Sequence, residues 1–168
     1  YPMGFDDNGL PTERLVEKRL GITAAQVGRT AFIEKCLEIS ERIFGIENPQ
    51  TASAINNLGA FYDDSGDYTK AGSFFLRALK IRENNPGPDS TDYAISANNM
   101  AELYFKTGRY EEAESLYLKA LSIVRKAYGE GSPFYAISLN NLGALYQSKG
   151  AYNKAESYLL EAMAVRKK

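Results

Sequence analysis

The sequence contains no histidine, and Cys36 is the single cysteine among its 168 residues. Histidine is the commonest general base and the commonest metal ligand near neutral pH, so its absence removes the usual starting point for a catalytic or metal site. One cysteine excludes an internal disulfide and is typical of a reducing compartment. We therefore expect a cytoplasmic protein that is not an enzyme and that carries no metal and no cofactor.

A surplus of charge and a long apolar run are missing as well. Twenty lysines and arginines stand against 21 acidic residues, which gives a net charge of −1. Such a balance, with a sequence pI of about 5.6, lacks the basic character that nucleic-acid binding requires. No apolar run approaches the roughly 18 residues that span a bilayer. A protein or peptide partner is favoured, with neither nucleic acid nor membrane involved.

What the sequence does have is internal repetition. Residues 56–74, 98–116 and 140–158 each contain a pair of asparagines, a tyrosine, a glycine and an alanine in the same register. The period is 42 residues, and no insertion interrupts it. It relates Asn57, Asn99 and Asn141; Tyr62, Tyr104 and Tyr146; Gly66, Gly108 and Gly150; and Ala71, Ala113 and Ala155.

Within each unit, apolar residues follow the spacing of a helix, and short glycine-containing turns separate two such stretches. Asn48, Ser90 and Ser132 are placed to cap first helices, whereas Gly45, Gly87 and Gly129 fall where second helices should end. The pattern predicts antiparallel helices at about residues 49–64, 67–85, 91–106, 109–128, 133–148 and 151–168. Residues 24–44 match a second helix of an earlier unit, and a shorter helix near 11–20 would be its partner.

The repeated residues resemble the signature of the tetratricopeptide repeat. This signature consists of a large residue, then Leu-Gly, then a tyrosine, and an alanine followed by an aromatic residue in the next helix. The corresponding residues here are Ile55, Leu58-Gly59, Tyr62, Ala71 and Phe75. The 42-residue units are similar to those of kinesin light chains. The resemblance implies an all-α fold, a right-handed solenoid of antiparallel helix pairs. It would occupy residues 11–168, with a degenerate unit at 11–45 and full units at about 49–87, 91–129 and 133–168, after an irregular segment at 1–10.

Several repeated residues have packing roles in this interpretation. A glycine within a helix costs about 1 kcal/mol relative to alanine, so Gly59 and Gly143 are expected to allow close packing against Ala71 and Ala155. The tyrosines Tyr62, Tyr104 and Tyr146 are expected to fill the space between units. Cys36 occupies the place of an alanine in the packed stripe and is expected to be buried.

The asparagines at positions 57, 99 and 141 point away from the buried stripe. In a tetratricopeptide solenoid the first helices line the concave surface, where a column of amides could bind the backbone of an extended peptide. Alternatively, the amides only bridge adjacent helices, a role we expect first for Asn56, Asn98 and Asn140. The candidate peptide-binding residues are Asn57, Asn99, Asn141, Ile95, Glu102, Phe105, Lys106, Ile137 and Asp64.

The charges on this face narrow the kind of ligand. Its only cation is Lys106, against Asp64 and Glu102, so neither a clamp for a C-terminal carboxylate nor a basic groove for acidic motifs is indicated. Ile95, Ile137 and the nearby Phe105 suggest pockets for apolar side chains instead.

Two short stretches resemble binding loops but lack a residue that such loops require. Residues 63–67 resemble a fragment of a calcium loop but lack its distal glutamate, so we expect a plain turn. Residues 129–132 are rich in glycine but lack the lysine of a phosphate-binding loop.

We expect an interaction scaffold that binds a peptide or a helix of a partner in the concave groove. The alternative is a regulatory or sensor segment of a larger enzyme or signalling ATPase. The last helix carries more apolar surface than its partner helix can cover, at Tyr158, Leu159, Ala162, Met163 and Val165. We expect either self-association through this C-terminal helix or a continuing repeat.

Overall fold

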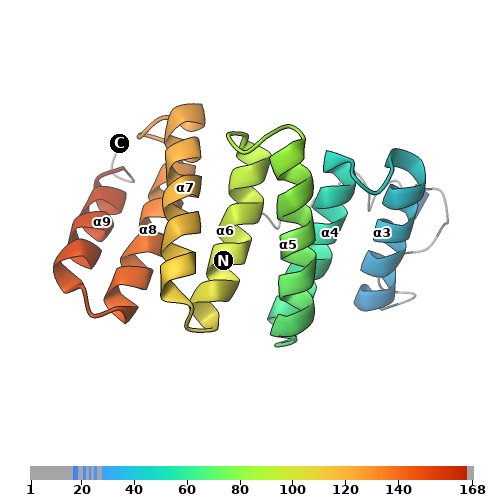
Figure 1. Cartoon of the computed structure of the whole chain (residues 1–168), viewed down its shortest axis with the longest axis horizontal. Coiled ribbons are helices and arrows are strands. Elements are labelled where there is room, and N and C mark those ends of the chain that lie inside the picture. Colours follow the sequence, from blue (N-terminus) through green and yellow to red (C-terminus); the bar gives the residue numbers. More distant parts are fainter. Residues whose placement is uncertain (1–16, 19–20, 22, 24, 26–27, 166–168) are drawn as a thin grey trace. The chain divides into compact units, whose positions relative to one another are not determined.

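The structure, a computed structural model, describes residues 17–18, 21, 23, 25 and 28–165, and the regular structure in this part of the chain is all helical (Figure 1). The helices are α3 (Arg29–Phe44), α4 (Pro49–Asp64), α5 (Tyr68–Asn84), α6 (Thr91–Lys106), α7 (Tyr110–Tyr128), α8 (Pro133–Ser148) and α9 (Tyr152–Val165). The all-α class is confirmed, and every helix expected from residue 49 onward begins within one residue of its expected start. The segment expected to be irregular at 1–10 lies outside the described residues, as does most of the helix expected near 11–20.

The helix starts follow from local capping. The Asn48 side chain accepts a hydrogen bond from the N–H of Gln50 at 2.9 Å, and Ser90 Oγ accepts one from the N–H of Tyr93 at 3.1 Å. Ser132 caps α8 in the same way. Each cap satisfies an N–H group that the helix itself leaves unpaired, which stabilises the helix by about 1 kcal/mol. The three expected caps are confirmed.

The helix ends follow the expected glycines at two of three places. Gly45 and Gly129 follow α3 and α7 with φ angles of 91° and 78°, which a residue without a Cβ adopts readily. The expectation for Gly87 was wrong, because α5 already ends at Asn84. Its C-cap, Asn85, precedes Pro86, and a residue before proline is driven out of the helical region into the extended one observed here.

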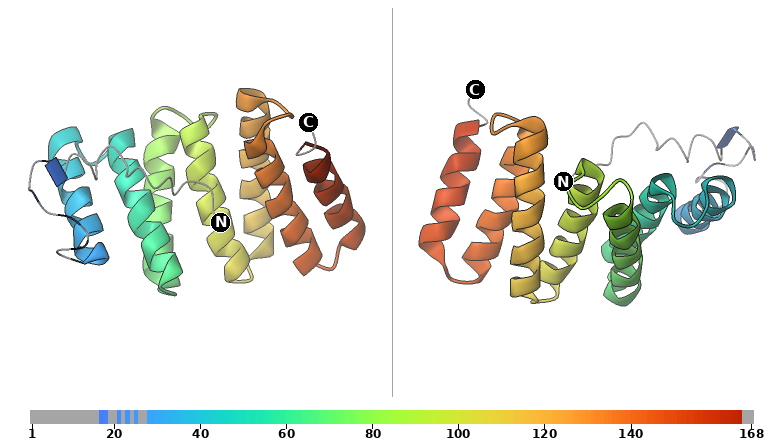
Figure 2. Two further views of the ribbon diagram at one scale, coloured as in Figure 1. Left: turned by 180° about the vertical axis from the view of Figure 1, so that it is seen from behind. Right: turned by 45° about the horizontal axis from the view of Figure 1, so that its top comes forward.

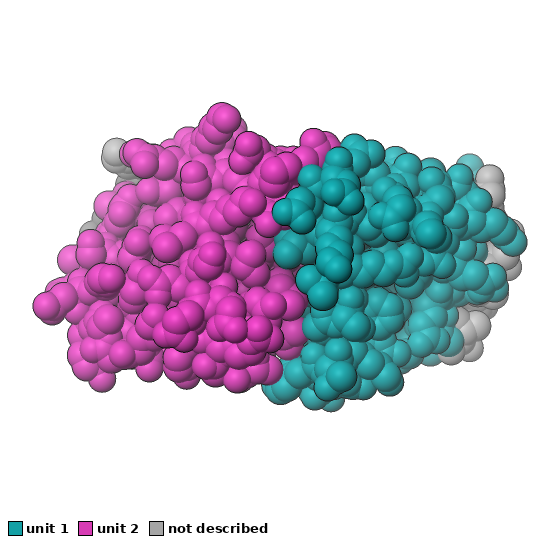
Figure 3. Space-filling view, viewed as in Figure 1, with its two compact units in different colours: residues 1–85 teal, residues 86–168 magenta. Residues whose placement is uncertain are grey.

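The helices divide between two compact units, coloured separately in Figure 3. Unit 1 (residues 1–85) contains α3 to α5, and unit 2 (residues 86–168) contains α6 to α9. In unit 1, α4 packs against both α3 and α5. In unit 2, the pairs α6/α7 and α8/α9 are joined by packing of α7 against α8. Consecutive helices within each unit run antiparallel, as Figure 2 shows.

The core of unit 1 is built by the inward stripes of its three helices. Ile55 and Leu58 of α4 pack against Ile81 of α5 and against residues of α3. The side chains of Ile55, Leu58 and Ile81 are almost fully buried. A smaller cluster on α3 contains Cys36, so its expected burial is confirmed. Burial of each large aliphatic side chain contributes about 1.5–3 kcal/mol, which makes this stripe the main source of stability for short helices.

The core of unit 2 joins its two helix pairs. Tyr117 of α7 packs with Leu142, Leu145 and Tyr146 of α8, and Ala155 of α9 completes the cluster. The alanines Ala101 and Ala113 lie in the same cluster at the crossing of α6 and α7. Small residues at the crossing let the two helix backbones approach closely, as expected from the repeated alanines.

The two helical glycines are tightly packed, but against other residues than expected. A Cβ on Gly59 would lie 2.7 Å from two ring carbons of Phe75, and a Cβ on Gly143 would lie 2.7 Å from a methyl group of Leu159. The expected neighbour Ala71 is not among the nearest groups, and Ala155 is reached only through its carbonyl oxygen at 3.6 Å. One helical turn after each alanine, the second helix carries a larger side chain, and this larger side chain contacts the glycine first.

Candidate functional site

The exposed side of α6 presents four of the candidate residues in one row. Ile95, Asn99, Glu102 and Lys106 follow each other at helical spacing, so they share a face. Ile95 is 41% exposed although it is a large aliphatic residue. Asn99 and Glu102 are half-buried. The row therefore combines an accessible apolar group with polar groups beside it.

The corresponding row on α8 consists of Ile137, Asn141, Ala144 and Ser148. Asn141 Nδ2 donates a hydrogen bond to Asn98 Oδ1 on α6 at 2.9 Å, so the two rows lie on adjoining helices. Asn98 is only 4% exposed, and the bridging role expected for it is confirmed. Asn141 thus contributes to bridging as well, while its amide keeps a second N–H group and an acceptor oxygen. We call these two rows together the asparagine face of unit 2.

Charge on the asparagine face is compensated within α6. Lys106 Nζ lies 3.1 Å from Glu102 Oε1, one helical turn away, with about a third of each side chain exposed. Such a pair stabilises a helix by only about 0.3–0.5 kcal/mol. Its consequence is electrostatic, because the lysine that the sequence offered as the only cation of this face is neutralised by its neighbour.

The equivalent face in unit 1 carries Ser53, Asn57 and Ala60, all half-buried, with the exposed Asp64 at its end. The sequence pattern predicts no arginine on this face, yet Arg82 of α5 reaches it: Nη2 donates a hydrogen bond to Ser53 Oγ at 2.9 Å. Arg82 is 4% exposed. The sequence contains a signal for this role, because Arg82 is a charged residue at a repeat position where the neighbouring repeats have a small or apolar residue, Ser40 and Val124.

Phe105 is the candidate residue that the structure turns inward. It is partly buried, packs against the core cluster of unit 2, and its ring centroid lies 6.0 Å from that of Tyr110. We therefore treat Phe105 as a support of α6 and not as part of the asparagine face.

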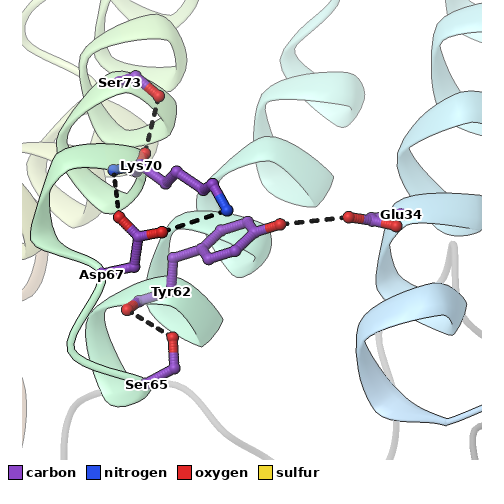
Figure 4. Close-up of polar contacts among 6 residues, drawn as sticks. All are labelled: Glu34, Tyr62, Ser65, Asp67, Lys70 and Ser73. Carbon is purple, nitrogen blue, oxygen red and sulfur yellow. Dashed lines mark hydrogen bonds and ion pairs between the residues drawn. The ribbon is translucent and has the colours of Figure 1, made fainter.

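Tyr62 marks the junction of α4 with α3 in unit 1 (Figure 4). Its hydroxyl donates a hydrogen bond to Glu34 Oε1 on α3 at 3.2 Å, and its ring stacks on Phe74 at a centroid distance of 5.6 Å. Lys70 Nζ lies 4.7 Å from the ring centroid and 3.2 Å from Asp67. Burial and, after it, the hydrogen bond to Glu34 raise the pKa of Tyr62.

Tyr146 repeats this arrangement in unit 2. Its hydroxyl donates a hydrogen bond to Glu114 Oε1 on α7 at 2.6 Å, and Lys149 Nζ lies 2.6 Å from the second oxygen of the same carboxylate. Tyr158 stacks on the Tyr146 ring at 5.5 Å, and Lys154 Nζ lies 5.0 Å from the ring centroid. The hydrogen bonds from Lys149 and Tyr146 hold the pKa of Glu114 below its usual value. The position of these tyrosines at the junctions follows from the repeat, whereas their carboxylate partners are not predicted by it.

Neither a metal site nor a membrane segment is found in the described part of the chain. No group of three or more histidine, cysteine, aspartate or glutamate side chains there could hold a metal ion. None of the described helices is long and apolar enough to cross a membrane. In the stretch 63–67, Asp67 accepts a hydrogen bond from the N–H of Lys70 at 3.1 Å and so caps α5, in keeping with the turn expected there.

Comparison with known proteins decides the family. A family model described as tetratricopeptide repeat matches residues 17–84, 50–117 and 92–168, which together cover most of the chain. The chain belongs to the tetratricopeptide repeat family. The resemblance inferred from the repeated residues is therefore confirmed.

Solved structures of other repeat proteins share this fold. BtubC (BKLC) from P. vanneervenii superposes with a TM-score of 0.75 at 26% identity, over 85% of this chain and 59% of that protein. A kinesin light chain of Podosopora anserina with nearly identical TPR-like repeats gives a TM-score of 0.67 at 19% identity, over 92% of this chain and 73% of the other. The likeness to kinesin light chain repeats is confirmed at the level of the fold.

Sequence relatives of a different kind match only in part. A valine–tRNA ligase from Wolbachia sp. subsp. Brugia malayi is 46% identical over 68 residues, which cover 40% of this chain and 8% of that protein. The valine–tRNA ligase of Rickettsia akari is 66% identical over 41 residues, or 24% of this chain and 5% of that protein. The chain therefore spans a small fraction of the length of these relatives.

Proposed function

We propose that this chain is a protein-interaction scaffold and that the asparagine face of unit 2 binds a peptide or helix of a partner protein. Tetratricopeptide repeats generally mediate contacts between proteins, which supports the class of function. The choice of surface rests on Ile95, whose exposed aliphatic side chain stands beside amides that can bind a peptide backbone. Asn57 and Asp64 would serve the equivalent face of unit 1.

The charge pattern supports a particular kind of partner segment. Lys106 and Glu102 neutralise each other, so the face offers no free positive field to a C-terminal carboxylate or to an acidic motif. Ile95 and Ile137 offer apolar contact at the opposite end of the same two helices. A neutral segment with a large apolar side chain near that end fits this arrangement, and this chain contributes no catalysis of its own.

Two substitutions of matched size and exposure test the surface. Ile95→Asp on α6 places a charge on the asparagine face, whereas Leu118→Asp places one on α7, where the leucine is 39% exposed. Burying an uncompensated carboxylate against a partner is strongly unfavourable, so Ile95→Asp should weaken binding by more than about tenfold. Leu118→Asp should bind like the parent.

The measurement uses immobilised parent chain to capture a partner, followed by calorimetry with the purified partner and each variant. Thermal unfolding of both variants is the control for folding. Equal affinities for parent and Ile95→Asp would show that the partner binds elsewhere. Asn141 is unsuitable for this test, because its bond to Asn98 links folding to any effect on binding.

A second candidate function is that of a regulatory or sensor segment within a larger enzyme or signalling ATPase. The observation in its favour is the partial match to valine–tRNA ligases, in which a segment similar to this chain accounts for 8% or less of the protein. The natural reading frame around these residues provides the test. A catalytic domain in the same frame supports this candidate, and a frame that encodes repeats alone contradicts it. The cytoplasmic location and the division into units at residues 11–45, 49–87, 91–129 and 133–168 stay predictions.

A further inference from the structure

An exposed pair of aromatic residues adjoins the asparagine face of unit 2. Phe134 of α8 stands three residues before Ile137 and therefore extends the α8 row of that face by one turn. Tyr128, the last residue of α7, lies beside it, with a ring-centroid distance of 4.9 Å and an angle of 38° between the rings. Phe134 is 46% exposed and Tyr128 is 49% exposed, so both rings are accessible although they are large and apolar.

Both rings belong to helices whose neighbours are in place. Helix α7 has α6 and α8 packed against it, and α8 has α7 and α9 packed against it. The exposure of Tyr128 and Phe134 is therefore a property of the array between α6 and α9. The pair is also particular to this junction, because the residues 42 positions earlier are Pro86 and Asp92.

The groups around the pair favour an extended ligand. Polyproline II segments dock on surfaces lined by aromatic rings, and their preformed conformation keeps the entropy cost of binding low. Such a segment has no internal hydrogen bonds, so all its carbonyl groups are free. The amides of Asn99 and Asn141 can donate to these carbonyls, as can the Tyr128 hydroxyl, which has no hydrogen-bond partner within the described part of the chain. Glu102 and Lys106 neutralise each other, so an uncharged segment fits.

We propose that Tyr128 and Phe134 bind a proline of a partner segment that is in the polyproline II conformation. An aliphatic residue close to that proline then contacts Ile95 and Ile137. This inference rests on the proposed function of the asparagine face and specifies the class of its ligand. Phe134 and Ile137 are separated by about 4.5 Å along α8, whereas a polyproline II segment advances about 3.1 Å per residue. A segment that runs along α8 therefore reaches both contacts with residues about one to two positions apart.

A capped peptide of prolines with one leucine near its centre is a defined probe. Fluorescence anisotropy of the labelled peptide with the full chain should show saturable binding. Phe134→Leu keeps an apolar side chain but removes the ring, so it should weaken binding about tenfold, and Tyr128→Leu should act in the same direction. Tyr152→Leu is the matched control, because Tyr152 of α9 is an aromatic residue that is 69% exposed, and it should bind like the parent. Thermal unfolding checks that each variant is folded.

A thermodynamic cycle identifies the contact itself. A matched peptide with alanine in place of every proline should bind the parent at least about tenfold more weakly, and Phe134→Leu should not weaken it further. Independent effects of the two changes would mean that the prolines bind elsewhere. Tighter binding of a peptide with arginine in place of the prolines would assign the rings to a cation. Either result, or failure of the proline peptide to bind the folded parent, overturns the proposal.

Ile95→Asp separates this inference from the proposed function. A captured partner that loses affinity with Ile95→Asp but not with Phe134→Leu would keep the asparagine face as the binding surface and overturn the role of the aromatic pair. A partner that ignores both changes would overturn the proposed function as well. Sedimentation velocity tests a second copy as the occupant, because any self-association should be equal for the parent and Phe134→Leu. Self-association that Phe134→Leu abolishes would assign the pair to a second copy and overturn the choice of a proline-containing segment.

Discussion

Tyr146 on α8 and Glu114 on α7 are joined by a hydrogen bond of 2.6 Å between the tyrosine hydroxyl and the carboxylate. In unit 1, Tyr62 and Glu34 are joined in the same way at 3.2 Å, across the α4–α3 junction (Figure 4). In both places a tyrosine of the first helix of one repeat binds a carboxylate on the second helix of the preceding repeat, and at the α8–α7 junction Lys149 binds the same carboxylate. In the α8–α7 contact, Tyr146 is buried and Glu114 is half-buried, so this hydrogen bond also defines the register of the two helices, whereas Glu34 in the α4–α3 contact is exposed.

Removal of the Tyr146 hydroxyl tests the strength of this contact. Tyr146→Phe keeps the stacking on Tyr158 and leaves Glu114 paired with Lys149, so only one hydrogen bond to a charged group is lost. We expect the free energy of unfolding to fall by about 1.5–3 kcal/mol in urea titrations. Tyr152→Phe is the control, because Tyr152 is 69% exposed, and it should unfold like the parent. Equal stability of both variants would contradict the role assigned to the hydroxyl.

The same contact predicts a dependence on pH. The pKa of Glu114 in the folded state lies below the ordinary value of 4.5 for a glutamate, chiefly because Lys149 and then Tyr146 donate hydrogen bonds to the charged form. A depressed folded pKa contributes stability that is present above the unfolded pKa and is lost as pH falls through the folded one. Glu114→Gln should therefore be less stable than the parent at neutral pH, and the difference should shrink below pH 4.5. A difference that stays constant down to strongly acidic pH would show that the charge of Glu114 is irrelevant to folding.

Alanine substitutions of the two helical glycines should have unequal effects. Alanine gains up to about 1 kcal/mol in helix propensity at either position. At Gly59 the new Cβ meets the ring of Phe75, which is buried and cannot move, so we expect Gly59→Ala to lose about 1–3 kcal/mol. At Gly143 it meets the end of the half-buried Leu159 side chain, which can turn away. Gly143→Ala should therefore melt close to the parent, and the reverse order of melting temperatures would refute this packing.

The hydrogen bond from Asn141 to Asn98 should contribute measurably to the free energy of unfolding. Asn141→Ala removes the donor to Asn98 and leaves a buried carbonyl oxygen without its partner, which should cost about 1–3 kcal/mol. Ser148→Ala changes an exposed residue on the same row of α8 and should have an effect within about 0.5 kcal/mol. If the two variants unfold at the same urea concentration, the amides of this row are free for ligands and do not brace the helices.

Cys36 offers a chemical probe of α3. Its thiol is buried with Phe32 and Ile39, so a thiol reagent such as Ellman's reagent should react slowly with the native chain and rapidly in urea. In a Cys36→Ala background, Ser73→Cys places a thiol at an exposed site of α5 and should react at once. Rapid labelling of Cys36 in the native chain would indicate that α3 opens independently of α4.

The sequence alone determined the features that depend on neighbours along the chain. Helix starts were predictable because Asn48, Ser90 and Ser132 cap backbone groups two or three residues away. The buried stripes were predictable because a helix brings every third and fourth residue onto one face. Because the 42-residue period is exact, the same local rules apply to each repeat, and the repeated residues identify the family. The end of α5 also has a local cause, because Asn85 precedes a proline and cannot continue the helix.

The tertiary structure decided which side chains meet between helices. Tyr62 binds a carboxylate 28 residues before it, and Tyr146 binds one 32 residues before it, so the repeat period does not predict the partner. Arg82 reaches Ser53 over 29 residues, and Phe75 rather than Ala71 covers Gly59. These contacts depend on how the helices cross and on the length of each side chain. The pattern of apolar and polar positions in the sequence specifies neither. The sequence therefore determined the helices and their order, whereas packing selected the few polar contacts that fasten one helix to the next.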